Sequence, residues 1–98
     1  MKVFIQPSAL ADLRAGFRFY EKQQAGLGGY FLDSLYSDID SLLLYAGAHR
    51  IVFGSHRANA NRFPFAIYYR VEGEVVRVRA IIDCRRNPKW IRRRLEKN

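Results

Sequence analysis

The expected fold rests on one stretch of the chain, residues 63–71, which reads FPFAIYYRV. Every second residue from Phe65 to Val71 is apolar, and a period of two is typical of a β-strand with one buried face. Glu72 and Gly73 follow directly and predict a tight turn. Beyond this turn the chain is expected to continue as a meander of strands.

One further strand is predicted on each side of that stretch. The apolar residues at even positions from Val76 to Ile82 are expected to face the core. The odd positions then lie on the other face, so that Arg77 and Arg79 are predicted to project together from the sheet. Before the central stretch, residues 57–61 alternate polar residues with alanines, which predicts a weaker strand at the edge of the sheet.

The first half of the chain has a helical period instead. A short strand is predicted over Val3–Ile5, and apolar residues then recur every three or four positions after Pro7 and again from Phe31 to Ala46. The glycine-rich residues 23–29 separate these two runs, so two helices are predicted to form an antiparallel hairpin. Gly16, inside the first helix, is expected to let another element approach closely.

The chain ends in a short basic helix that is predicted over residues 89–96. Pro88 is suited to the first turn of this helix, and Trp90, Ile91 and Leu95 are expected to anchor it. The sequence therefore predicts one α+β domain over residues 1–98. It comprises an N-terminal strand, a helical hairpin packed on a mainly antiparallel, curved sheet, and the short C-terminal helix.

Positive charge is concentrated near the C-terminus. The net charge is +8 at pH 7, and residues 77–98 hold nine of the 17 Lys and Arg residues but only two of the nine Asp and Glu residues. The local net charge is therefore +7, against +1 for residues 1–76. Clustered cations favour an acidic protein or a nucleic acid as partner, and a merely solvated basic face is the alternative.

Several common classes of protein are not expected. The single cysteine, Cys84, allows no internal disulfide and provides no cysteine-based metal site, so we expect it to be a small buried side chain. We expect neither a metal nor another cofactor. Since no apolar run is long enough for a signal peptide or a membrane helix, a cytoplasmic protein without a membrane partner is expected.

A series of motifs runs along the chain: Asp12-Leu13, Phe19-Tyr20-Glu21, Gly26-Leu27-Gly28, Phe31, residues 62–71, Arg85-Arg86-Asn87-Pro88 and Trp90. In this order and at this spacing, the motifs resemble those of the RelE/ParE toxins of bacterial type II toxin-antitoxin systems. The resemblance implies a toxin that a cognate antitoxin neutralises in a hetero-oligomer through an acidic or amphipathic segment. It also implies one of two targets, since RelE-like members cut mRNA on the ribosome and ParE-like members bind DNA gyrase.

The residues available for RNA cleavage help to weigh these two branches. Metal-independent cleavage needs a proton acceptor, a cation for the phosphate and an acid. RelE-like enzymes use lysines, arginines, a C-terminal tyrosine or histidine, but this chain has no lysine between Lys22 and Lys89 and no tyrosine or histidine after Tyr69. The chain is therefore predicted to inhibit gyrase, with an mRNA endonuclease as the alternative and a non-toxic nucleic-acid-binding module as the second alternative. If it is a nuclease, the candidate catalytic residues are His56, Arg62 and Arg85.

A separate set of residues is predicted to bind the antitoxin or the target. Phe65 and Tyr69 are assigned to the core, whereas Tyr68 lies on the opposite face of its strand and is the freer aromatic for stacking. Trp90 is expected to hold the last helix in place and is also a candidate for partner contact. The predicted binding residues are Arg57, Arg77, Arg79, Arg85, Arg86, Trp90 and Arg93.

Overall fold

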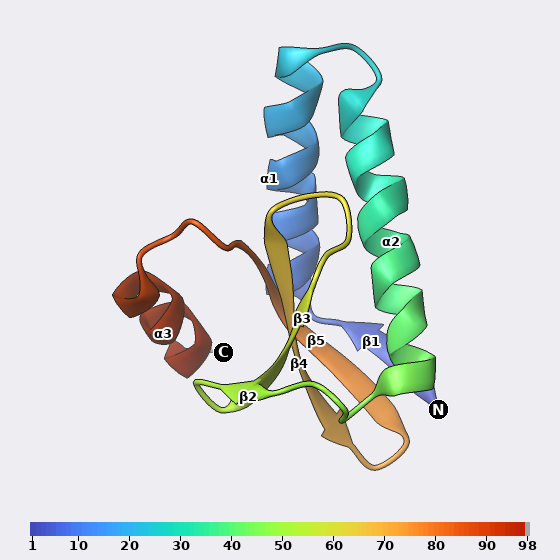
Figure 1. Cartoon of the computed structure of the whole chain (residues 1–98), viewed down its shortest axis with the longest axis vertical. Helices are drawn as coiled ribbons and strands as arrows, with labels where there is room; N and C mark the ends of the chain where they lie inside the picture. The colour runs from blue at the N-terminus through green and yellow to red at the C-terminus, as the bar shows by residue number, and fades with distance from the viewer. Residues whose placement is uncertain (98) are drawn as a thin grey trace.

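Strands and helices follow one another in the expected order, with the short strand β2 added, in this computed structural model, which describes residues 1–97 (Figure 1). Asn98, the last residue of the predicted domain, lies outside the described residues. The elements are β1 (Lys2–Ile5), α1 (Pro7–Gln23), α2 (Leu27–Tyr45), β2 (Ile51–Val52), β3 (Ser55–Asn59), β4 (Phe65–Glu72), β5 (Val75–Asp83) and α3 (Pro88–Lys97).

One mixed sheet joins all the strands in the order β1-β5-β4-β3-β2. The pairs β2–β3, β3–β4 and β4–β5 are antiparallel, while β1 lies parallel to β5 with Lys2 beside Val75 and Ile5 beside Val78. The expectation of a mainly antiparallel sheet is thus confirmed. The pairing of β1 covers only the first half of β5, because the chain turns into α1 at Pro7.

The two faces of the sheet are covered by different helices, and Figure 1 shows the α1–α2 hairpin and α3 on different sides of the strands. Phe65, Ile67 and Tyr69 of β4 pack under the hairpin, as predicted. Ala66 and Tyr68 point the other way and pack under α3. The prediction of a free Tyr68 is therefore wrong, since α3 leaves only 1% of this residue exposed.

A bulge in β5 changes which residues face the hairpin. Tyr69 pairs with Val78 but Tyr68 pairs with Ala80, so Arg79 is an extra residue without its own partner in β4. Val78 and the residues before it keep the predicted alternation. After Arg79 it is reversed, and Ala80 faces α3 instead of the hairpin. The prediction of one continuous apolar face from Val76 to Ile82 is wrong for this reason.

Glycines let the two helices of the hairpin pack closely. A Cβ atom on Gly16 would lie 2.5 Å from the Phe31 ring, which confirms the predicted close approach. A Cβ on Gly28 would lie 2.7 Å from the carbonyl oxygen of Phe17. Gly28 lies in the first turn of α2, which begins at Leu27, so the loop predicted over residues 23–29 is shorter than expected.

The β2–β3 hairpin differs from the predicted edge strand. The strand expected over residues 57–61 spans Ser55–Asn59 and is not at the edge, because β2 pairs with it from outside. Phe53 and Gly54 form the turn between them, with φ values of 52° and 81°. A strand as short as β2 has too few residues to produce a visible alternation.

Candidate partner-binding groove and basic surfaces

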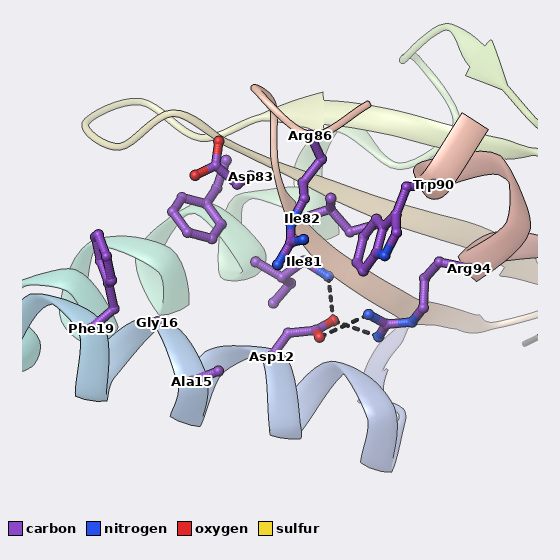
Figure 2. Close-up of a pocket in the computed structure, with 11 residues that line it drawn as sticks. Asp12, Ala15, Gly16, Phe19, Ile81, Ile82, Asp83, Arg86, Trp90 and Arg94 are labelled. Atoms are coloured by element: carbon purple, nitrogen blue, oxygen red, sulfur yellow. Dashed lines mark hydrogen bonds and ion pairs between the residues drawn. The ribbon is translucent and has the colours of Figure 1, made fainter. Parts of the chain in front are cut away.

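A groove of about 320 Å³ runs along the second half of β5, between α1 and the start of α3 (Figure 2). We call it the β5 groove. Figure 2 shows α1 forming one wall, with Trp90 and Arg86 on the other side of β5. The groove is lined by Asp12, Ala15, Gly16, Phe19, Phe65, Ile81, Ile82, Asp83, Arg86, Trp90 and Arg94.

The groove exists because β1 ends before β5 does. Beyond Val78, side chains from α1 replace the missing strand as hydrogen-bond partners for part of the β5 backbone. The Ser8 hydroxyl donates to the carbonyl of Arg79 over 3.3 Å, and the Asp12 carboxylate accepts the amide N–H of Ile81 over 2.9 Å. These bonds hold the N-terminal part of α1 against β5 and leave the groove open further along the strand.

Asp12 also links α1 to α3. The Arg94 guanidinium donates to both carboxylate oxygens of Asp12 over 2.9 and 2.7 Å, and both side chains are largely buried. Such a two-point contact fixes the orientation of both groups. Sequence reasoning missed Arg94 among the many cations of the tail, although its position three residues after Ile91 places it on the inward side of the helix.

Of the predicted binding residues, Arg86 and Trp90 line the groove, and Arg85 lies beside it, bonded to Asp83 of the groove lining. The Arg86 guanidinium lies over the Trp90 ring, 4.3 Å from its centre. Arg85 is highly exposed and donates to both carboxylate oxygens of Asp83 over 2.9 and 2.7 Å. The hydrogen bond from Arg85 is the main reason that the pKa of Asp83 lies below its usual value.

The remaining predicted binding arginines are dispersed. Arg79 is only 3% exposed, and it donates to the Ser55 hydroxyl over 2.5 Å and to the carbonyl of Leu95 over 2.8 Å. Its assignment as a partner contact is therefore wrong, because the bulge turns it beneath α3. Arg77 is paired with Glu72 on the outside of the sheet, and Arg93 is exposed on α3.

The three candidate catalytic residues do not form one site. His56 stacks on Tyr69, and its Nδ1 donates to the carbonyl of His49 over 2.6 Å. These contacts stabilise the fold around the β2–β3 hairpin. Arg85 follows the C-terminal end of β5, where Asp83 pairs with Phe65 of β4. His56 pairs with Tyr69, four positions further along β4. At 3.3 Å per residue, the pairing positions of His56 and Asp83 are therefore about 13 Å apart along the sheet. Arg62 is an exposed residue of the β3–β4 loop.

A second basic site lies on the α3 side of the β2–β3 hairpin. Arg50, Val52, Arg57 and Asn59 line a concavity of about 350 Å³. The Nε atom of Arg57 is buried there and has no hydrogen-bond partner among residues 1–97. An unsatisfied buried donor is costly, so an oxyanion at this position would stabilise the site. Burial is the main reason that the pKa of the neighbouring Tyr68 is raised, and the charge of Arg57 partly offsets this.

Clusters of metal-ligating side chains and helices long and apolar enough to span a membrane are both absent from residues 1–97. No cluster of three or more His, Cys, Asp or Glu side chains suited to a metal ion occurs in this part of the chain. Among the same residues, no helix combines the length and hydropathy needed to cross a bilayer.

No family model and no curated protein match the chain. Among solved structures, a chain of the chromosomal ParDE TA system from P. aeruginosa superposes on it with a TM-score of 0.76. The two sequences are 23% identical, and the match covers 85% of this chain and 95% of the other. The likeness establishes the fold, and the expected α+β class with an N-terminal strand, a helical hairpin and a C-terminal helix is confirmed.

Proposed function

We propose that this chain is a ParE-like toxin of a type II toxin-antitoxin pair. The observation that carries the proposal is the likeness to a chain of the ParDE system, with a TM-score of 0.76 over 85% of this chain. The motifs from Asp12 to Trp90 that resemble RelE/ParE toxins support the same assignment from the sequence. A fold alone does not imply a function, so the proposal also depends on the site.

The proposed target is DNA gyrase. The separation of His56 from Arg85 argues against RNA cleavage at one site, because a general base must lie within hydrogen-bond reach of the proton that it removes. The histidine is also engaged in the contacts that hold the β2–β3 hairpin. A protein that acts by binding requires no such assembly of acid and base groups.

The proposed partner is an antitoxin with an acidic or amphipathic segment. Residues 77–98 carry a net charge of +7, and Arg86 and Trp90 line the β5 groove, with Arg85 bonded to Asp83 beside them. Complementary charge raises the rate of association and excludes partners of the wrong sign. The complex is then a hetero-oligomer in the cytoplasm.

Pulsed expression in bacteria, with and without the product of the adjacent reading frame, tests the toxin and its antitoxin together. We expect growth arrest by this chain alone and rescue on co-expression. Purified chain is then added to gyrase and relaxed plasmid, and the supercoiling rate should fall at micromolar concentrations. An unchanged rate contradicts gyrase as the target, and normal growth contradicts the toxin assignment.

Cleavage of mRNA is retained as a second candidate because of the site at Arg50 and Arg57. Two arginines and the Asn59 amide are suited to a phosphodiester, and the buried Nε of Arg57 needs an acceptor. Mapping of mRNA 5′ ends after pulsed expression tests this function. New cuts phased to codons would support it, with loss of cutting in Arg57→Ala. Arrest without new cuts contradicts it.

Binding to bare nucleic acid provides the test for a non-toxic binding module. Such a module would bind duplex DNA or single-stranded RNA with strong dependence on salt. We expect no binding at physiological salt if the chain is a toxin. Salt-dependent binding together with normal growth on expression would replace the toxin proposal by this one.

A further inference from the structure

We propose that the unpaired half of the β5 edge accepts an extended segment of the partner as an additional strand. The segment would lie in the β5 groove, beyond the end of β1, and would pair with residues 80–83. This inference rests on the proposed function, because the partner is the proposed antitoxin. It adds the mode of binding, the backbone atoms that take part and the kind of sequence that fits.

The direction of the backbone groups in β5 follows from one hydrogen bond at its end. The amide of Cys84 donates to the carbonyl of Pro64 over 2.8 Å, so residue 84 turns its backbone groups toward the strand β4 side. In an antiparallel pair such residues alternate with residues whose N–H and C=O point away. Ile81 and Asp83 therefore direct their backbone groups to the open edge, as the bond from Ile81 N–H to Asp12 independently indicates.

The bulge at Arg79 is what brings these groups to the edge. Before the bulge, the outward carbonyls belong to even residues, since Val78 accepts the amide of Gln6 over 3.0 Å. After it, they belong to odd residues, and the carbonyl of Arg79 accepts the Ser8 hydroxyl. The bulge thus changes the residues of β5 whose backbone groups point to the open edge from even to odd positions, at the point where β1 ends.

Two backbone groups remain available at this edge. The carbonyl of Asp83 accepts the amide of Arg86 over 3.1 Å, and the amide of Ile81 is bonded to Asp12. For the carbonyl of Ile81 and the amide of Asp83, the described residues provide no partner outside the sheet. One extended residue offers an N–H and a C=O at the spacing that these two groups require. An added strand would satisfy both groups.

The walls of the groove define the side chains that fit. Phe19 is 54% exposed and lines the groove on the α1 side, while Trp90 lines it on the α3 side, so apolar side chains of the segment can be buried there. Arg86 contributes a positive charge at the mouth, stacked on Trp90 rather than paired with a carboxylate among residues 1–97. The partner segment should therefore combine apolar residues with at least one carboxylate.

Amide hydrogen exchange in the complex tests the added strand directly. The chain is labelled with ¹⁵N and purified alone and with the co-expressed product of the adjacent reading frame. The amide of Asp83 should exchange at least about tenfold more slowly in the complex, because it gains a hydrogen bond. The amide of Ile81, which is already bonded to Asp12, should change much less and serves as the internal reference.

A pair of matched substitutions tests the position of the segment. Phe19→Arg should weaken the affinity for the same partner by about tenfold or more, because it removes an apolar contact from the groove. Tyr45→Arg is the control, since Tyr45 is similarly exposed at 59% but does not line the groove. The affinity of this variant for the partner should stay within about twofold of that of the unchanged chain. Circular dichroism of both variants verifies that they are folded.

The possible outcomes separate the inference from the proposed function. If the partner binds and rescues growth but the Asp83 amide still exchanges rapidly, strand addition is wrong and the toxin assignment stands. A helix docked in the groove would give this result, with weaker binding of Phe19→Arg. If this chain alone does not arrest growth, the proposed function is wrong. Slow exchange at Asp83 with selective loss of affinity in Phe19→Arg supports the added strand.

Discussion

The two faces of the sheet are stabilised in different ways. Beneath the α1–α2 hairpin the core is almost entirely apolar, with Phe31, Leu35 and Ile39 of α2 fully buried against the sheet. Beneath α3 the apolar cluster is smaller, and a buried arginine, Arg79, hydrogen-bonds to the carbonyl of Leu95. The hairpin is thus held mainly by apolar packing, to which Ser8 and Asp12 add hydrogen bonds with the β5 backbone. Helix α3 is held by a smaller apolar cluster together with the hydrogen bond from a buried arginine.

This difference indicates which part of the chain can unfold while the other part stays folded. Apolar packing spreads its stabilisation over many contacts, while a buried ion depends on a few partners that must all be present. We therefore expect substitutions on the hairpin face to unfold the whole domain. Substitutions on the α3 face should first release the C-terminal helix and its basic surface.

The largest effect is expected from truncation of buried side chains on the two faces. Phe31→Ala should lower the free energy of unfolding by about 3–5 kcal/mol, and Leu95→Ala by about 2–5 kcal/mol. Urea unfolding gives both values, and amide exchange shows where each variant opens. For Leu95→Ala we expect fast exchange in α3 and slow exchange in the hairpin. Equal exchange throughout the chain would mean that the two faces form one cooperative unit.

Replacement of the buried arginine comes next in size. Arg79→Met removes the donors to Ser55 and Leu95, and bonds from a charged group contribute about 1.5–3 kcal/mol each. Removal of the buried charge offsets part of this loss, so we expect a net destabilisation of about 2 kcal/mol in urea unfolding. Arg77→Met is the control on the exposed side and should stay within about 0.5 kcal/mol. A stabilised Arg79→Met would show that packing alone suffices beneath α3.

Two neighbouring glycines should respond with opposite signs. Gly28→Ala places a Cβ atom 2.7 Å from a backbone oxygen of α1 and should destabilise the hairpin by about 1–3 kcal/mol. A Cβ on Gly29 meets no atom within 4 Å, so Gly29→Ala should stabilise the protein by up to about 1 kcal/mol through helix propensity. Thermal unfolding of the two variants measures this difference. If Gly28→Ala is also stabilising, the two helices are less closely packed than described.

The smallest effect is expected at the exposed pair of Asp83 and Arg85. The pKa of Asp83 is lowered from 3.8 chiefly by the hydrogen bond from Arg85, so its contribution to stability is present above pH 3.8. This contribution is lost as the pH falls through the lowered pKa. Asp83→Asn should therefore have a slightly lower Tm than the unchanged chain at pH 7, and this difference should shrink as the pH is lowered below 3.8. A difference that stays constant over this pH range would exclude ionisation as its cause.

Much of the fold could be predicted from the sequence because the strongest patterns are local. The period of the two helices and the alternation of β4 are visible in single stretches, and their elements occur where expected. The bulge at Arg79 has no such local signal. Its existence depends on how β5 pairs with β4, and it decides the fate of Arg79, which was predicted to be exposed and is buried.

The candidate site was predictable in part. Arg85, Arg86 and Trp90 were identified from charge and aromatic character. Arg86 and Trp90 line the β5 groove, and Arg85 is bonded to Asp83 of its lining. The groove itself arises from the early end of β1, which is known only once β1 is placed beside β5. For the same reason the bond between Asp12 and Arg94, which are distant in sequence, was not predictable from either residue alone.

The parallel pairing of the first strand also affects how this protein emerges during synthesis. Because Lys2 pairs with Val75, more than seventy residues must be added before the sheet can close, or about 4–15 s at roughly 5–20 residues per second. The hairpin is complete by Tyr45 and can form much earlier. Its apolar face is then exposed on the nascent chain for several seconds. In that interval a chaperone can bind before the chain has acquired its finished surface.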